Sequence, residues 1–176
     1  MTLTYASPVS VRPAPPFIRK TDIRQSLLPI SRTPHRLQYV ATVHDVMFID
    51  DSYSVNVNSG WYALETMFTP TVLIISASSG EQTDYSGLDA LVADKCHTLV
   101  FLGTDNTSLH AHFDRLGKEH RLTLIDTDNL QKAVQASYHA ARSGDTVLFS
   151  PCAEGRDLFC DYQDRGMQFT QTVRAL

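Results

Sequence analysis

The stretch TVLIISASSGEQTDYSGLDALVADKCHTLVFLG, residues 71–103, decides the fold class of this chain. It begins and ends with near-continuous apolar runs, and the segment between them carries Leu88, Leu91 and Val92 at helical spacing. Such apolar runs are typical of parallel strands that are buried on both faces. The stretch therefore predicts a strand, a right-handed crossover helix and a second, parallel strand.

The same alternation of strand and helix continues along the chain. Further strands are predicted at RLTLID (121–126) and DTVLFS (145–150), each preceded by an amphipathic helix. Upstream, LQYVATV (37–43) and VMFID (46–50) flank His44-Asp45 and predict an antiparallel hairpin, although its turn lacks the favoured glycine. The expected fold is α/β: a Rossmann-like, doubly wound, mostly parallel sheet with an antiparallel hairpin at its start.

Apolar spacing also predicts which faces of the helices are buried. One helix is expected to turn Val57, Trp61, Leu64 and Phe68 inward. A later helix is expected to begin at Asp128 with a capping box to Gln131, and to bury Leu130, Ala133, Val134 and Ser137. The last helix is expected to carry a stripe of Phe159, Tyr162, Phe169 and Val173.

The first residues differ in composition from the rest. Residues 1–16 contain four prolines and no apolar period, and they predict an extended arm that either a second subunit or the domain's own surface would order. The folded domain is expected to span residues 17–176, beginning with a short helix from Thr21 that Pro29 ends.

Charge and composition exclude several classes of protein. A net charge of −4 gives no reason to expect nucleic acid or an anionic membrane as partner. No apolar run is long enough to span a bilayer, and the amino terminus does not have the pattern of a signal peptide, so a cytoplasmic protein is expected. Cys96, Cys152 and Cys160 have no paired spacing and are expected to be free thiols.

Three polar loops follow strands of the expected sheet, at residues 50–60, 76–87 and 150–159. Because ligands of such sheets bind beyond the carboxyl ends of the strands, the loops predict a binding site. The alternative is that Ser59, Asp84 and Asp157 only cap helices and turns.

Common catalytic motifs are absent from the sequence. It contains no phosphate-binding loop of the form G-x-x-x-x-G-K-[ST], no G-x-G-x-x-G and no G-x-S-x-G. His110 and His112 have no carboxylate or thiolate cluster that would complete a metal site, and no metal is expected.

Several stretches resemble the carboxyl-terminal domain of Mur ligases, most closely those that add D-glutamate in peptidoglycan synthesis. The resemblance runs from about residue 18 to residue 176. It rests on Pro34-His35-Arg36, on Asp51-Ser52 with Asn56, and on Ser150-Pro151 with Asp157, Phe159, Arg165 and Gly166. In that family this domain closes over an ATPase domain and holds the incoming amino acid, which attacks an acyl phosphate. The resemblance implies the same fold here, and a stand-alone copy of that domain.

The chain departs from the family pattern at the substrate pocket. Tyr53 stands where the family has lysine, Val55 where it has threonine, and Glu81 where it has a second lysine. Gly155 replaces a serine that donates to the substrate, and Arg156 replaces an apolar neighbour. These changes replace positive charge by negative charge where a dicarboxylate would bind.

Other family positions are kept. Asn56 and Tyr162 match the substrate pocket, while Arg36 and Asp51 match positions that face nucleotide. The family uses ATP and Mg²⁺, but without a phosphate-binding loop the isolated chain is expected to bind neither. We expect no catalytic residue in it.

Three functions remain open at this point. The first is a degenerate, catalytically inactive domain that acts as a binding or interaction module and has an unidentified small molecule or a second copy as partner. The second is the amino-acid-binding subunit of a split ATP-dependent ligase, acting with a partner protein in peptidoglycan synthesis. The third is a small-molecule sensor.

Overall fold

The computed structural model describes residues 33–77 and 83–176. The predicted arm, the helix from Thr21 and Glu81 lie outside the described residues. The strands are β1 (Gln38–Val43), β2 (Val46–Asp50), β3 (Thr71–Ser76), β4 (Cys96–Leu102), β5 (Thr123–Thr127) and β6 (Thr146–Phe149). The helices are α2 (Val57–Glu65), the 3-10 turn η1 (Ser86–Leu88), α3 (Asp89–Lys95), α4 (Thr107–His120), α5 (Leu130–Ala140) and α6 (Tyr162–Arg174).

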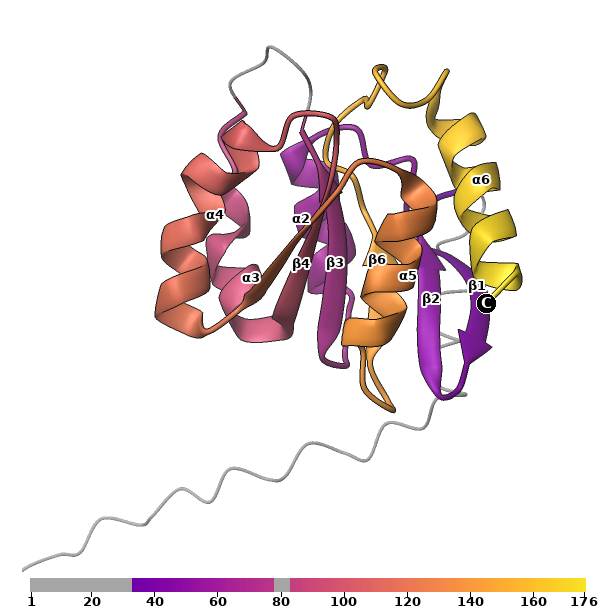
Figure 1. The fold of residues 1–176 in the computed structure, drawn as a ribbon, viewed down its shortest axis with the longest axis horizontal. Coiled ribbons are helices and arrows are strands. Elements are labelled where there is room, and N and C mark those ends of the chain that lie inside the picture. Colours follow the sequence, from indigo (N-terminus) through magenta and orange to yellow (C-terminus); the bar gives the residue numbers. More distant parts are fainter. Residues whose placement is uncertain (1–32, 78–82) are drawn as a thin grey trace, which may run out of the picture.

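One sheet of six strands organises the domain, in the order β1-β2-β6-β3-β4-β5. The β1–β2 pair is antiparallel and every other neighbouring pair is parallel, which confirms the predicted sheet and its hairpin. The hairpin turn forms without glycine because His44 and Asp45 both adopt the left-handed backbone, with φ of 43° and 73°. Figure 1 shows α2, α3 and α4 on one face of the sheet and α5 and α6 on the other.

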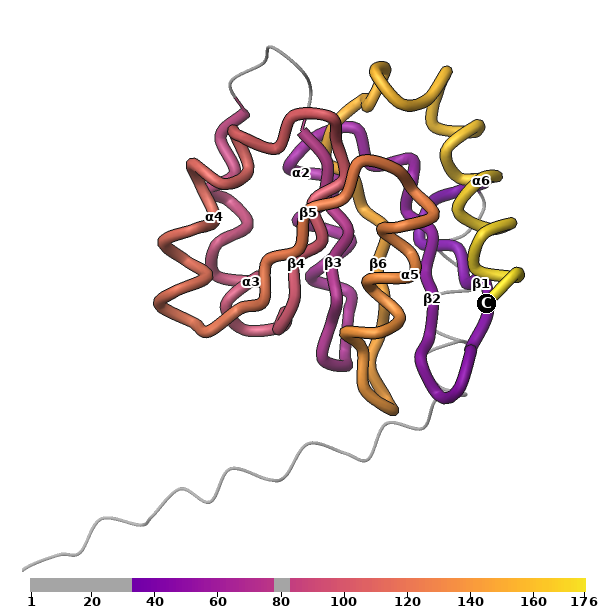
Figure 2. Tube along the Cα trace, viewed as in Figure 1, coloured from indigo at the N-terminus to yellow at the C-terminus, as the bar shows by residue number. Residues whose placement is uncertain are grey.

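Each face of the sheet carries its own apolar core. Leu73 and Ile75 of β3 pack on the side of α2, α3 and α4, whereas Val72 and Ile74 pack on the side of α5 and α6. Successive strand residues point to opposite faces, so a strand buried on both faces reads as an unbroken apolar run. The trace in Figure 2 follows the crossovers that place helices on both faces.

The predicted buried face of the helix at residues 57–68 differs from the observed one. Trp61 and Phe68 are exposed by 43% and 60%, and α2 ends at Glu65, so Phe68 is not in the helix. The buried face of α2 is made of Gly60, Ala63 and Leu64 instead. It contains two small residues because α2 lies close to the loop after β6, where a methyl group on Gly60 would come within 2.1 Å of the Cys152 Sγ.

The ends of α5 and α6 also differ from expectation. The predicted capping box at Asp128 is wrong: Asn129 is the N-cap of α5 and accepts a hydrogen bond from the Lys132 N–H at 2.9 Å. Asp128 pairs with the Lys132 ammonium instead, at 2.8 Å. The inward face of α5 is as predicted. Phe159 is buried but precedes α6, which begins at Tyr162 after the N-cap Asp161.

Candidate functional site

A cleft of about 940 Å³ lies beyond the carboxyl ends of β2, β6 and β3. All three predicted polar loops line it, so the structure brings together the segments that the sequence singled out. The lining residues are Val55, Asn56, Val57, Asn58, Thr83, Asp84, Ser86, Gly87, Cys152, Ala153, Glu154, Arg156 and Asp157. Of the predicted pocket positions, Val55, Asn56 and Arg156 line the cleft, whereas Tyr53, Gly155 and Tyr162 lie outside its lining.

Arg165 fixes two of the three loops from beneath. Its side chain is fully buried at the start of α6, and all the hydrogen bonds that its guanidinium donates within the described residues go to backbone carbonyls. Nε and Nη2 reach the Ser52 carbonyl at 3.0 and 2.6 Å, and Nη1 reaches the carbonyls of Ala153 and Glu154, each at 2.7 Å. Arg165 therefore links the loop after β2 to the loop after β6, and we call these hydrogen bonds the Arg165 clamp.

Gly155 is explained by this clamp. Its backbone has φ of 65°, a conformation that favours glycine, and a methyl group placed there would lie 3.2 Å from the Arg165 Nη1. A side chain at this position would therefore strain the backbone and crowd the guanidinium.

Asp51 is buried in the same framework. Its Oδ1 accepts from the Leu37 N–H at 3.2 Å, and its Oδ2 accepts from the Ser150 hydroxyl at 2.8 Å. Burial raises the pKa of Asp51 to about 7, against the opposing effect of these two hydrogen bonds. Both carboxylate oxygens already have protein donors, and the residue is 3% exposed. Its burial and its two internal hydrogen bonds fit a structural role, and its predicted position facing a nucleotide stays a prediction.

The other predicted nucleotide position, Arg36, is exposed and lies near two aromatic rings. Its Cζ is 5.8 Å from the ring centre of Tyr53 and 5.9 Å from that of Tyr62. Tyr53 in turn meets Tyr162 edge to face, with ring centres 5.1 Å apart. Tyr53 and Tyr162 thus belong to an aromatic surface beside the cleft.

The charges on the cleft wall are mostly negative. Asp84, Glu154 and Asp157 line it, and Arg156 is the one cationic side chain among its described lining residues. The Arg156 Nε lies 2.5 Å from a carboxylate oxygen of Glu154, so its charge is already paired. Some of these polar side chains also have local structural roles, which was the alternative prediction for the loops. Asp84, for example, accepts a hydrogen bond from the Ser86 N–H at 2.9 Å.

Asn56 similarly has a local partner. It is the N-cap of α2, and its Oδ1 accepts from the N–H and the hydroxyl of Ser59 at 2.9 and 3.1 Å. The predicted capping role of Ser59 is thus reversed, since Ser59 donates to the cap. Sequence reasoning missed Arg165 as the organiser of the loops, although the two glycines near it, Gly155 and Gly166, signalled a close approach of backbone and side chains.

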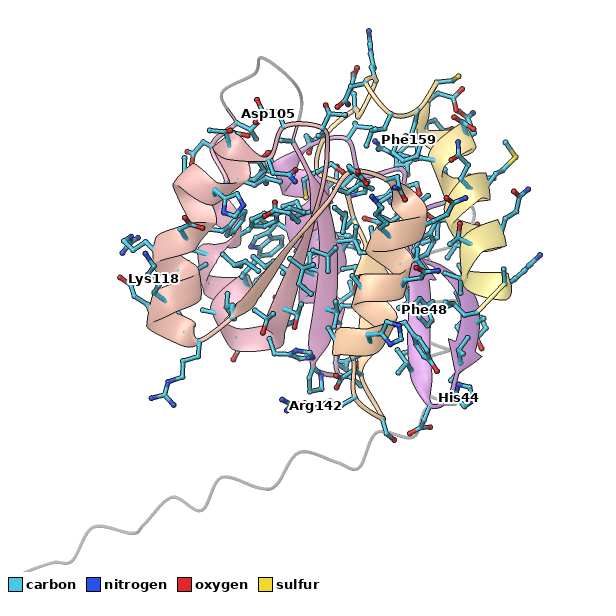
Figure 3. All side chains as sticks on the ribbon, viewed as in Figure 1. His44, Phe48, Asp105, Lys118, Arg142 and Phe159 are labelled. Carbon is cyan, nitrogen blue, oxygen red and sulfur yellow. The ribbon has the colours of Figure 1, made fainter. Side chains whose placement is uncertain are left out.

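A second, shallower pocket of about 480 Å³ lies at the ends of β4 and β5, near Asp105 (Figure 3). There the His110 ring nitrogens contact Asp114 at 2.8 Å and Asp126 at 2.9 Å. These hydrogen bonds raise the pKa of His110. Among residues 33–77 and 83–176 no three His, Cys, Asp or Glu side chains gather as metal ligands would.

Two further predictions can be compared with the described part of the chain. Cys96, Cys152 and Cys160 are all free thiols, as expected, and burial raises the pKa of Cys96 and of Cys152 to about 12. None of the helices found in that part is long and apolar enough to cross a membrane.

Known proteins with related sequences give the family. A relative from Bacteroides fragilis, a UDP-N-acetylmuramoylalanine--D-glutamate ligase, is 46% identical over 160 residues, which cover 90% of this chain and 35% of the relative. The enzyme of the same name from Porphyromonas gingivalis is 43% identical over 156 residues, covering 89% of this chain and 34% of its own. The chain thus spans about a third of the length of these relatives.

Solved structures support the fold alone, because their sequence identities are low. A folylpolyglutamate synthase from Mycobacterium tuberculosis matches with a TM-score of 0.55 at 13% identity, over 80% of this chain and 32% of its own. A murein peptide ligase from Psychrobacter arcticus matches with a TM-score of 0.52 at 11% identity, over 78% of this chain and 30% of its own. Residues 35–153 match the family model described as Mur ligase, glutamate ligase domain, and the chain therefore belongs to the Mur ligase family.

Proposed function

We propose that this chain is a binding or interaction module derived from the Mur ligase carboxyl-terminal domain, without ligase activity of its own. The observation that carries the proposal is the charge of the cleft. Three carboxylates line it, and its one described cationic side chain, Arg156, is paired with one of them. A dicarboxylic amino acid needs cations or several strong donors around it.

The expected loss of affinity for such a ligand is large. A like-charge pair about 4 Å apart costs roughly 4 kcal/mol at an effective dielectric of about 20. Each charged hydrogen bond that is missing removes about 1.5–3 kcal/mol more. Because about 1.4 kcal/mol is tenfold in affinity, these effects together lower binding of D-glutamate by several orders of magnitude.

The same proposal covers the nucleotide. Asp51 already has protein partners on both oxygens, and the Arg36 guanidinium lies within cation–π distance of Tyr53 and Tyr62. The sequence has no phosphate-binding loop to hold ATP with Mg²⁺. We therefore expect no nucleotide binding by the chain alone, and its partner to be a small molecule of another kind, a ligase partner protein or a second copy. Its place of action is expected to be the cytoplasm.

Thermal unfolding in the presence of D-glutamate tests the cleft. The wild-type chain is expected to show no shift, and the variant Tyr53→Lys/Val55→Thr/Glu81→Lys is expected to gain a measurable, saturable one. A free ligand concentration of about 100 times Kd stabilises the folded protein by about 2.7 kcal/mol, and a thermal unfolding scan detects a change of that size. The matched control Tyr53→Gln/Val55→Thr/Glu81→Gln changes the same positions without adding charge, so it should not respond. Binding of D-glutamate to the wild-type chain would contradict the proposal.

Titration with ATP tests the second half of the proposal. No heat of binding is expected when ATP and Mg²⁺ are added to the isolated chain. Binding in the micromolar range, or formation of an amide bond by the chain unaided, would show that it keeps an active site.

A second candidate is the amino-acid-binding subunit of a split ligase in peptidoglycan synthesis. It is favoured by the similarity of the chain to relatives that are named UDP-N-acetylmuramoylalanine--D-glutamate ligases. A neighbouring gene for a Mur ligase that lacks this domain would support it, and amide formation on mixing the two products would establish it. Failure of the purified pair to form an amide from any amino acid would reject it.

A further inference from the structure

The solvent side of helix α2 is aromatic at its middle and polar at its two ends. Four exposed residues at positions i, i+3, i+4 and i+7 form this side, opposite the buried residues of the helix: Asn58, Trp61, Tyr62 and Glu65. In a helix this spacing gives one continuous stripe. Trp61 and Tyr62 are each 43% exposed. Large apolar side chains that gather on an exposed face, with polar residues around them, are typical of a surface that contacts a partner.

Arg36 adds a positive charge beside the first half of this face. Its Cζ is 5.8 Å from the ring centre of Tyr53, which precedes α2, and 5.9 Å from that of Tyr62, which lies on the helix. Arg36 is exposed, and no ion pair to it is found within the described part of the chain. Tyr, Trp and Arg are the residue types that contribute most of the binding energy at protein interfaces.

Glu65 supplies the opposite charge at the carboxyl end of the same face. Its side chain is 51% exposed, and its Oε2 lies 3.6 Å from the Lys95 ammonium. That ammonium also donates to the backbone carbonyls of Leu64, Glu65 and Met67, at 3.2, 2.5 and 3.1 Å. The three protons of the ammonium therefore have backbone acceptors, and the Glu65 carboxylate can accept from a further donor.

We propose that two copies of this chain pair through α2 in an antiparallel arrangement. A two-fold axis at the middle of the face places the Trp61 ring of one copy against the Tyr62 ring of the other. It also places Arg36, beside the first half of one helix, next to Glu65 at the end of the other, so that two ion pairs form. A two-fold interface needs this order of charges, because the surface must be complementary to itself. The inference names the partner of the interaction module proposed above and rests on that proposal in this respect.

The size of the face predicts a weak dimer. An aromatic side chain can bury about 150–250 Å², so the exposed fractions of Tyr53 (39%), Trp61 and Tyr62 give roughly 250 Å² of apolar surface in each copy. A standard interface buries about 450 Å² of apolar surface on each partner. Because smaller interfaces are typical of transient complexes, we expect a dimer Kd on the order of 10 μM.

Sedimentation equilibrium of the full chain tests the pairing. Between about 1 μM and about 300 μM, the average mass should rise reversibly from that of one chain toward that of two, by mass action. Trp61 is the single tryptophan of the chain and reports the same equilibrium, because its burial in the dimer shifts its fluorescence to shorter wavelength. The midpoints of the two measurements should agree.

Charge reversal locates the contact. Arg36→Glu and Glu65→Arg should each weaken dimerisation at least about tenfold, because each brings like charges together, and the double variant should return to within about threefold of the wild type. Trp61→Ala/Tyr62→Ala should give a monomer that still unfolds cooperatively on heating, because both side chains are exposed. The matched control Arg174→Glu reverses a charge in the last turn of α6, on the opposite face of the sheet (Figure 1), and should leave dimerisation unchanged.

Three results would overturn the proposal. The first is the mass of a single chain at every concentration, whether Trp61 is solvent-exposed or covered by another occupant. The second is a dimer that persists in Trp61→Ala/Tyr62→Ala, because another face would then form it. The third is a double charge variant that dimerises as weakly as the single ones, because Arg36 and Glu65 would then not meet. None of these results alters the D-glutamate and ATP tests of the cleft.

Discussion

Raising the pH from about 5 to about 8 should weaken folding of the wild-type chain, and Asp51→Asn should remove much of that loss. Asp51 is 3% exposed and sits between the Leu37 N–H and the Ser150 hydroxyl. Burial raises its pKa from 3.8 to about 7 in the folded protein. The folded state therefore keeps a proton that the unfolded state has already lost.

The sign and size of the effect follow from this difference in pKa. The stability that protonated Asp51 contributes is fully present below pH 3.8 and is lost as the pH rises through about 7. At about 1.4 kcal/mol for each pKa unit, the whole loss is on the order of 4 kcal/mol. Between about pH 5 and about pH 8 the loss is roughly 2–3 kcal/mol, because part of it occurs at lower pH.

Asparagine is a close substitute for the protonated carboxyl. Its amide oxygen can accept from the Leu37 N–H, and its amide nitrogen can donate to the Ser150 hydroxyl oxygen, so Leu37 and Ser150 each keep a hydrogen bond to this side chain. His110 changes stability in the same direction, since its pKa is also raised. The comparison of variant with wild type, more than the pH curve alone, therefore isolates Asp51.

Urea unfolding followed by fluorescence is the assay. The free energy of unfolding is measured at both pH values for the wild type, for Asp51→Asn and for Asp94→Asn, which changes an exposed carboxylate on α3. The loss between the two pH values should shrink by about 2–3 kcal/mol in Asp51→Asn and stay unchanged in Asp94→Asn. An equal loss in all three proteins would refute the assignment of a raised pKa to Asp51.

Three further predictions concern the framework of the cleft. Arg165→Lys should destabilise folding by about 3 kcal/mol or more in urea titrations, because a lysine cannot reach all the carbonyls that the guanidinium satisfies; a loss below about 1 kcal/mol would contradict the clamp. Gly60→Ala should also destabilise, and Cys152→Gly should rescue it in a double-mutant cycle, since the added methyl group would lie 2.1 Å from the sulfur; additive effects would argue against that contact. Gly166→Ala would bring a methyl group within 2.2 Å of the His35 Nδ1, so we expect loss of cooperative thermal unfolding, and a normal transition would show that His35 moves freely.

The strands could be predicted from the sequence, and the reason is physical. The central residues of β3 and β4 are apolar on both sides because helices cover both faces of the sheet, and every residue of the two strands except His97 is buried. The buried faces of the helices were harder to predict from the sequence. The buried face of α2 includes Gly60 and Ala63, which a search for large apolar residues passes over, while Trp61 stays exposed. Close packing selects small residues that periodicity does not detect.

The loops of the candidate site could be predicted, but not the means by which they are held. Each strand end followed by Ser, Asp, Asn or Gly marked a loop on the ligand-binding edge, and all three line one cleft. Arg165 could not be found in this way, because an arginine in an amphipathic helix is usually a surface residue. Its partners are backbone carbonyls more than ten residues away along the chain. Because every residue has a backbone carbonyl, the sequence does not show which ones will accept a hydrogen bond from Arg165.

The way the loops are held separates the fold of this domain from its choice of ligand. Arg165, Asp51 and Ser150 are buried, and the hydrogen bonds that they make to the loops are internal to the protein, so the cleft keeps its shape without a ligand. Val55 and Arg156 lie on the cleft wall and Tyr53 beside it, where a substitution changes charge and contact surface while leaving the clamp intact. A family member can therefore replace the charges that select its ligand at little cost in stability, whereas a change at Arg165 would remove the cleft itself.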